Sequence, residues 1–294
     1  MTGSAPSLLG SWTAPLWPTL ALLAVVLLYL WGWRLPSRTP KRIHAWRLAA
    51  FFAGIAALWF ALTSALDLWT QFLLTAHMVQ HLLLMLVAPP LLLLGSPILV
   101  FWSGLARRRE PDRCGPFRFA GWGWMQRVGR PLTHPISAGV LMVAITIVWH
   151  IPHVFALAMR SAGWHSLENA TFFASGVLFW WPVIQPWPSK RQWPRWTIPL
   201  YLLGADLPVS VLSAYLAFCD HVVYSCYLAV PRRFGISALN DQVVAAMVMW
   251  VAMLLIFVSA SVVVVMDLFE PVAANESCAA DSRLRPDQVT PSAP

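Results

Sequence analysis

Histidine side chains are the residues of this sequence best suited to chemistry, and the most telling pair is His77 and His81. They are four residues apart, a spacing that places two side chains on one face of a helix with Cβ atoms roughly 5–6 Å apart. Two imidazoles in that arrangement can bind one metal ion. The pair lacks the glutamate of a zinc-protease motif, and the sequence has no phosphate loop or nucleophile elbow. We therefore do not expect an enzyme.

A second group of histidines follows at His150, His153 and His165. Pro152 separates the first two and is expected to bend the chain and redirect His153. Glu168 lies one helical turn after His165, and its carboxylate could accept a hydrogen bond from an imidazole and orient that imidazole toward a metal. Any of these histidines could equally be hydrogen-bonded structure. The candidate metal ligands are thus His77, His81, His150, His153 and His165, with Glu168 as an orienting residue.

Weaker candidates occur elsewhere in the chain. Cys219 and Cys226 flank His221, and their thiols could form a disulfide, stay free or bind Cu(I). Met78 offers a thioether, although most methionines in apolar helices simply pack. Asp241 and Gln242 begin the last apolar stretch, and we expect them either to cap that helix or to orient ligands by hydrogen bonds. Asp206 lies in the middle of an apolar stretch and needs a partner.

The composition is that of a membrane protein. Of the 294 residues, 59% are hydrophobic and only 11% are charged, against roughly 25% charged residues in soluble domains. The net charge of +8 could suggest nucleic-acid binding. Basic residues in the short loops between apolar stretches explain it better, so we expect lipid and no nucleic acid as a partner.

Seven stretches are long and apolar enough to cross a bilayer, which takes about 20 helical residues. Because lipid offers the backbone no hydrogen bonds, each should be a helix. We predict an all-α, polytopic bundle of about seven transmembrane helices over residues 1–274 and a disordered cytoplasmic tail over 275–294. The stretches run approximately over 16–33, 45–66, 72–100, 136–157, 167–184, 198–218 and 243–266. Pro89-Pro90 should bend or break the third.

The distribution of basic residues predicts the orientation. All but three of the 20 Lys and Arg lie after the first, third and fifth stretches or in the C-terminal tail. The other side keeps Arg160, Arg232 and Arg233. Because positive loops stay in the cytoplasm, we expect the N-terminus outside and the C-terminus in the cytoplasm. That topology places His77, His81, His150, His153, His165 and His221 at or near the outer side.

Several motifs together resemble the multi-spanning CtaG family of bacterial cytochrome c oxidase assembly factors. The first runs from His77-Met78-Val79-Gln80-His81 into Ala88-Pro89-Pro90 and Gly95-Ser96-Pro97. Three more follow in order: Trp149-His150-Ile151-Pro152, Phe179-Trp180-Trp181-Pro182, and Asp241-Gln242 before Met249-Trp250. They cover most of the chain. Two departures stand out, since Asn169 replaces a frequent family histidine and Ala246 a usual glycine.

The resemblance implies a multi-pass protein of the bacterial inner membrane that handles copper at its periplasmic face for a haem-copper oxidase. Its partners would be cytochrome c oxidase subunits and a periplasmic copper donor. Two alternatives stay open. Histidines on facing helices could bind haem in a redox protein, or the chain could be a metal-free transporter or scaffold, which Asp206 and the interrupted third stretch would suit.

Overall fold

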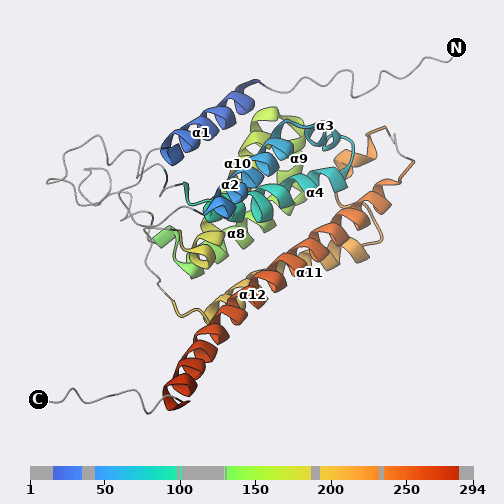
Figure 1. Ribbon diagram of the computed structural model, residues 1–294. Helices are drawn as coiled ribbons and strands as arrows, with labels where there is room; N and C mark the ends of the chain where they lie inside the picture. Colours follow the sequence, from blue (N-terminus) through green and yellow to red (C-terminus); the bar gives the residue numbers. More distant parts are fainter. Residues whose placement is uncertain are drawn as a thin grey trace, which may run out of the picture.

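The computed structural model describes residues 16–34, 44–97, 100, 129, 131–186, 193–231 and 235–284, with side chains as far as 269. Throughout these residues the regular elements are helices (Figure 1). The all-α prediction is therefore confirmed for the described part of the chain. The helices, in order, are α1 Leu16–Arg34, α2 Ala45–Thr63, α3 Ala65–Trp69, α4 Leu74–Leu82, the π-helical turn η2 Leu83–Val87, α5 Ala88–Leu94, α8 Pro135–His150, α9 Pro152–Arg160, α10 Ala162–Ile184, α11 Thr197–Phe218, the 3-10 turn η4 Ser225–Leu228 and α12 Ala238–Leu284.

Five segments are long and apolar enough to cross a membrane, and the bent pair α8–α9 would make a sixth. The five are Leu16–Arg34, Ala45–Trp69, Leu74–Leu94, Thr197–Phe218 and Ala238–Phe269. A multi-pass membrane protein fits these helices, while the count of seven stays a prediction. The remaining predicted span corresponds to α10. Its 23 residues are long enough to cross a bilayer, but its first half is polar and contains His165, Glu168 and Asn169.

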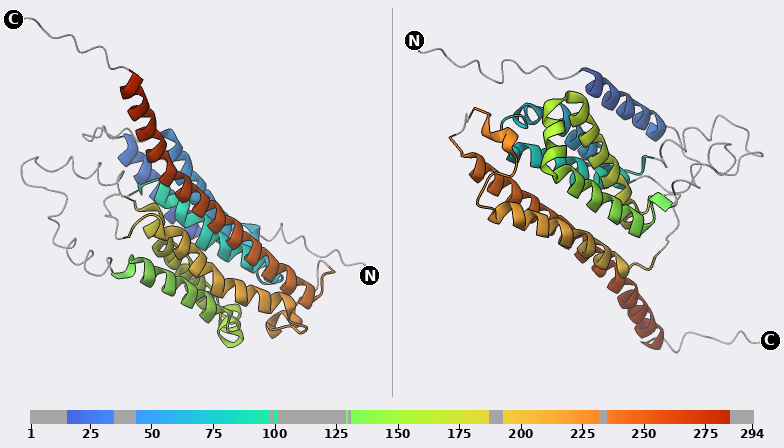
Figure 2. Two further views of the ribbon diagram at one scale, coloured as in Figure 1. Left: turned by 90° about the horizontal axis from the view of Figure 1, so that it is seen from below. Right: turned by 180° about the vertical axis from the view of Figure 1, so that it is seen from behind.

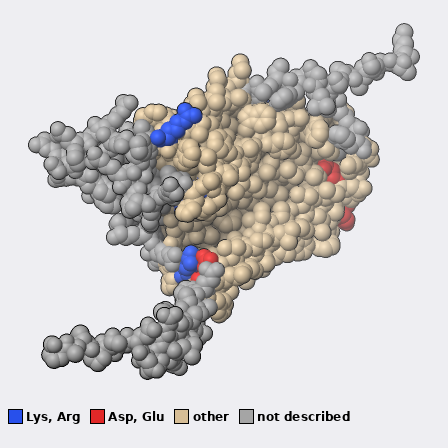
Figure 3. All heavy atoms as spheres, viewed as in Figure 1, with Lys and Arg blue, Asp and Glu red and all other residues tan. Residues whose placement is uncertain are grey.

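The molecular surface agrees with this assignment. In the view of Figure 3, charged side chains lie toward the two ends of the bundle, and a broad uncharged area separates them. Figures 1 and 2 show α11 and α12 running side by side, with α12 extending well beyond the other helices. That helix continues to Leu284, past residue 275 where the tail was predicted to begin. Most loops that carry Lys and Arg lie outside the described residues, so the orientation also stays a prediction.

Two prolines set the shape of the α4–α5 segment. Pro89 has no N–H to donate to the carbonyl four residues earlier, which belongs to Met85. The helix widens into the π-helical turn Leu83–Val87 just before it, and the indole of Trp180 on α10 donates its N–H to the Met85 carbonyl oxygen at 3.2 Å. The interruption predicted at the prolines is therefore a local change from α-helix to π-helix. The carbonyl of Met85 in this turn is hydrogen-bonded to the neighbouring helix α10.

A glycine lets α10 approach this turn. A Cβ atom on Gly176 would lie 2.7 Å from the Met85 carbonyl oxygen and 2.9 Å from the Met85 Cα. Real Cβ atoms do not come so close to backbone atoms, so only glycine allows the two segments to pack here. This contact fixes α10 against the α4–α5 segment, which carries His77 and His81.

The second bend occurs at Pro152. Helix α8 ends at His150, α9 begins at Pro152, and the two axes differ by 76°. Proline is tolerated in the first turn of a helix because its missing N–H is not needed there. The bend predicted from Pro152 is confirmed.

We predict that Gly176→Ala destabilises the protein. The added methyl group must push α10 away from the backbone at Met85, and forced overpacking costs about 1–3 kcal/mol. The measurement is thermal unfolding of the purified protein in detergent, where the melting temperature should fall by several degrees. Gly204→Ala is the matched control, because an added Cβ there meets no atom within 4 Å. Equal melting temperatures for the two variants would contradict the assigned role of Gly176.

Candidate metal centre

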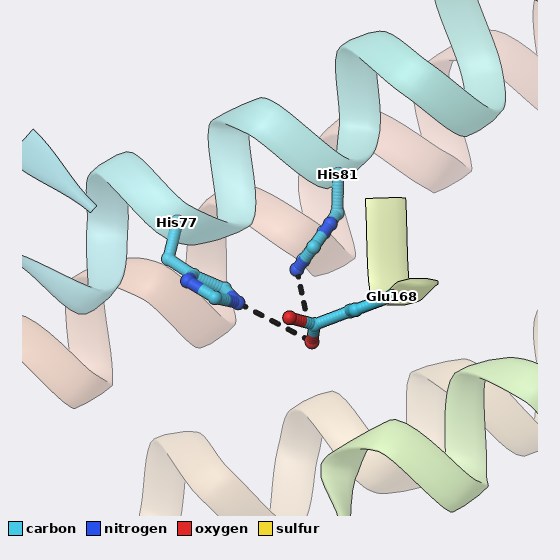
Figure 4. A group of neighbouring side chains, drawn as sticks. All are labelled: His77, His81 and Glu168. Atoms are coloured by element: carbon cyan, nitrogen blue, oxygen red, sulfur yellow. Dashed lines mark hydrogen bonds and ion pairs between the residues drawn. The ribbon is translucent and has the colours of Figure 1, made fainter. Parts of the chain in front are cut away.

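Three buried side chains meet between α4 and α10 (Figure 4). The Nε2 atoms of His77 and His81 lie 3.4 Å and 3.2 Å from the same oxygen of Glu168, Oε1. The exposed fractions of the three residues are 0%, 4% and 1%. Possible ligand atoms of all three lie within 4.8 Å of one another, close enough for a single ion to contact each.

The helical spacing of the two histidines produces this arrangement. Four residues on α4 bring the imidazoles together, with ring centroids 4.3 Å apart and planes at 80°. Aromatic rings then hold them in place, since Phe172 stacks on His81 at 4.3 Å and Phe155 lies 4.9 Å from His77. The predicted pairing of His77 and His81 on one face is confirmed.

Several polar atoms of the cluster have no hydrogen-bond partner. They are Nδ1 of His77, both ring nitrogens of His81, and Oε2 of Glu168. The Nε2 of His81 is within ion-pair distance of Glu168, but the angles do not make a hydrogen bond. Buried polar atoms without partners are rare in native proteins. Each neutral imidazole keeps one lone pair and the carboxylate keeps several, and a metal ion requires such free lone pairs close together.

His150 is a third buried imidazole with one free nitrogen. Its Nδ1 lies 2.7 Å from the Thr146 carbonyl oxygen. A carbonyl only accepts hydrogen bonds, so Nδ1 carries the proton and Nε2 keeps a lone pair. That Nε2 is buried without a partner. A backbone carbonyl that fixes the tautomer of an imidazole in this way is typical of histidines that bind metals.

His165 lies at the edge of the cluster, with its ring 5.5 Å from that of His77. Its Nε2 is 3.2 Å from Oε1 of Gln80. The Gln80 amide donates to the Ala61 carbonyl oxygen and to Oδ1 of Asp67, both at 2.8 Å, so its oxygen must accept from His165. The expectation that Glu168 could accept from an imidazole fits its contact with Nε2 of His77 on α4, whereas the partner of His165 is Gln80.

Gln80 was not among the predicted site residues. It lies between His77 and His81 on α4 and is fully buried. The signal was present in the sequence, because an amide inside an apolar stretch must find hydrogen-bond partners. Its position one residue before His81 places it next to the predicted ligands.

Neither His153 nor Met78 joins this cluster. His153 is exposed in the first turn of α9, directly after the bend at Pro152. Met78 is buried among apolar side chains of the core, as most methionines in such helices are. Asn169 is buried beside Glu168 in the chain, and its Oδ1 has no partner.

Asp241 and Gln242 hold the backbone in place instead of orienting the ligands. The Asp241 carboxylate accepts hydrogen bonds from the backbone N–H groups of Leu74 and Thr75 at 2.7 and 3.1 Å, and from the Thr75 hydroxyl at 2.6 Å. It thus caps α4 from the start of α12, where a negative charge favours the helix dipole. The Gln242 side chain accepts from the Val223 N–H at 2.8 Å. It donates to the carbonyl of Leu216 near the end of α11 and to the carbonyl of His221 in the segment after α11.

Cys219 and His221 lie in that segment, which joins α11 to η4, and Cys226 lies in η4 itself. His221 is exposed and contacts Cys219 and Asp220, whereas Cys226 is half-buried and burial raises the pKa of its thiol. Both thiols are free, so no disulfide joins them here. The last predicted polar residue, Asp206 on α11, is buried and accepts a hydrogen bond from the Ser210 hydroxyl at 3.1 Å, while its Oδ1 has no partner.

Fold and site together define a multi-pass helical membrane protein with a buried imidazole–carboxylate cluster. Residues 27–270 match the family model described as cytochrome c oxidase caa3 assembly factor (Caa3_CtaG). The chain belongs to this family, and the resemblance seen in the sequence motifs is confirmed. The family is one of assembly factors, which suggests a role other than catalysis.

Three curated mycobacterial relatives, each named as an uncharacterized protein, are similar to this chain. The chain is 24% identical over 208 residues to protein ML1998 of Mycobacterium leprae, covering 70% of this chain and 31% of that protein. It is 27% identical over 215 residues to protein Mb0105 of Mycobacterium bovis and to protein MT0111 of Mycobacterium tuberculosis, covering 71% of this chain and 32% of each. The chain thus spans about a third of the length of these relatives. No solved structure matches it.

We predict that Asp241→Ala destabilises the protein without removing the cluster of His77, His81 and Glu168. The variant loses the cap of α4 and leaves the N–H groups of Leu74 and Thr75 without a buried acceptor, at a cost of about 2 kcal/mol. The melting temperature in detergent should fall. Asp220→Ala is the control, since Asp220 is an exposed aspartate and its loss should leave the melting temperature unchanged. A stable Asp241→Ala variant would argue against the capping role.

Proposed function

We propose that this assembly factor binds copper between His77, His81 and Glu168 and passes it to cytochrome c oxidase. The observation that carries the proposal is the meeting of two imidazoles and one carboxylate, all buried, with ligand atoms within 4.8 Å. Imidazole suits copper among other transition metals. The free Nε2 of His150 makes it the next candidate ligand.

The charge of Glu168 supports a bound cation. Removing a carboxylate from water costs several kcal/mol unless a positive charge compensates it. Within the described residues its ion-pair partners are two imidazoles, which are neutral unless they take up a proton. A metal ion would supply the missing charge and use the free lone pairs at the same time.

The proposed orientation gives the cluster a direction. If seven helices span the bacterial inner membrane with the N-terminus outside, the start of α4 lies near the periplasm. Copper would then enter from a periplasmic donor and leave toward oxidase subunits on the same side. Glu168 and His165 come from the first half of α10, which is not among the five segments apolar enough to cross a membrane.

Haem is less suited to this geometry. A haem held by His77 or His81 and a histidine of a facing helix needs room for the porphyrin beside the imidazole, but Phe172 stacks on His81 and Phe155 lies 4.9 Å from His77. A small ion needs no such gap. Purified protein without a Soret band is the expected result, and a haem spectrum would favour the redox alternative.

We predict that wild-type protein holds about one tightly bound copper per chain and that the double variant His77→Ala, His81→Ala loses it. The variant removes both imidazoles that face Glu168. The measurement is anaerobic Cu(I) titration of the detergent-purified protein against a chelator, followed by metal analysis. Parallel titration with Zn(II) tests which metal the nitrogen and oxygen ligands prefer.

His153→Ala is the matched control, because this histidine is exposed and is not among the grouped ligands. It should bind copper as the wild type does. Glu168→Gln should weaken binding at least tenfold, since the amide keeps the shape but not the charge. Full copper content in the double variant would overturn the proposal. Normal oxidase maturation in cells that carry the double variant would favour a metal-free scaffold.

A further inference from the structure

Asp206 is the acidic residue of α11, and it is not part of the cluster of His77, His81 and Glu168. Its exposed fraction is 7%. Its Oδ2 accepts a hydrogen bond from the Ser210 hydroxyl at 3.1 Å, while its Oδ1 is buried without a partner. None of the ion pairs among the described residues includes it. In this part of the chain the carboxyl group thus has one neutral partner and no compensating charge.

Contacts at both ends of α11 show how deep in the bundle Asp206 lies. Just before α11, Nη2 of Arg195 lies 3.1 Å from Oδ2 of Asp267 on α12. Near the other end, the Gln242 amide of α12 donates to the Leu216 carbonyl oxygen at 3.2 Å. The two helices therefore run antiparallel and side by side, as Figures 1 and 2 show. Asp206 falls midway between these contacts, about 15 Å along the helix from each.

The helices that pack against α11 offer Asp206 no cation at this depth. They are chiefly α12 and α8. Residues 243–266 of α12 and 135–149 of α8 include no Asp, Glu, Lys, Arg or His. The titratable side chains described on these three helices, apart from Asp206, are Asp241 and Asp267 near the two ends of the α12 span, His150 at the end of α8, and Tyr201 and Tyr215 on α11. The Tyr201 hydroxyl donates to the Phe179 carbonyl oxygen at 2.9 Å.

An ionised carboxylate at this position would lack both water and a counterion. Burying such a charge without a partner costs far more than burying the neutral acid, so the group takes up a proton instead. Carboxyl groups inside membrane spans often form the proton relays of pumps and transporters. We propose that Asp206 is an exchangeable proton-binding site in the apolar interior of the bundle, with the Ser210 hydroxyl as the hydrogen-bond partner of its carboxyl group.

A proline beside Asp206 gives the proton a way to exchange. Pro208 lies inside α11 and has no N–H to donate to the carbonyl of Gly204. The helix therefore lacks one backbone hydrogen bond at the turn that carries Asp206, and helices bend at such positions. Loss of the proton leaves an uncompensated charge between apolar helices, so exchange with water requires α11 to open locally at this turn.

The first test is labelling of the full-length protein in detergent with dicyclohexylcarbodiimide, an apolar reagent that reacts with protonated carboxyl groups. At neutral pH the peptide that contains Asp206 should gain the adduct in mass spectrometry. Asp206→Asn keeps the shape of the neutral acid, so it should fold normally and lose the label. Asp241 is the internal control, because its oxygens accept hydrogen bonds from N–H and hydroxyl groups and its peptide should stay unmodified. Equal labelling of Asp206 and Asp241 would overturn the proposal.

The second test, infrared spectroscopy, does not depend on access of a reagent. The wild type should show the carbonyl band of a protonated carboxyl group that Asp206→Asn lacks, and this band should shift on transfer to D2O. A missing band, or one that does not shift, would overturn the proposal.

Two further controls separate this site from metal binding. Added NaCl at constant pH should leave the labelling of Asp206 unchanged, whereas protection by Na⁺ would indicate a metal-cation site and contradict the proposal. The double variant His77→Ala, His81→Ala should keep the Asp206 label, because the proton site uses none of the proposed copper ligands. The two hypotheses therefore stand or fall separately.

Discussion

A single carboxylate, buried among imidazoles inside an apolar bundle, is the constraint around which this structure is arranged. Glu168 is 1% exposed and shares one oxygen with His77 and His81. Its charge cannot be hydrated there, and the cost of burying it is several kcal/mol unless a cation is present. The helices that carry these residues must therefore be held in a fixed relation, or the carboxylate would be left without its partners.

Backbone groups at proline breaks and helix ends form hydrogen bonds to neighbouring helices, and these bonds hold the helices in place. Pro89 frees the carbonyl of Met85, Trp180 bonds to it, and Gly176 allows the close approach. At the other end of the segment, Asp241 satisfies the first N–H groups of α4. Helix ends and proline breaks leave polar groups that must be paired in an apolar environment. Here they are paired between helices, so each interruption becomes a point of attachment.

Further buried polar side chains lie next to this cluster, and each is costly in an apolar environment unless it is hydrogen-bonded. Gln80 links α4 to α2 and α3 through Ala61 and Asp67 while it orients His165. Such residues make the helices that hold them less apolar, and α10 is not among the five segments apolar enough to cross a membrane. Polar side chains inside a membrane bundle are energetically costly and are candidates for a functional site.

The sequence alone determined the helical class, the membrane character, the family and the pairing of His77 with His81. Each of these follows from local quantities: apolar content, motif residues and the helical repeat. The tertiary structure decided which of the other candidates join that pair. It placed Glu168 against α4 instead of His165, turned His153 outward at Pro152, and used Asp241 as a cap for a helix far away in the chain. Such partners depend on how helices pack, and a spacing within one helix carries no information about the facing one.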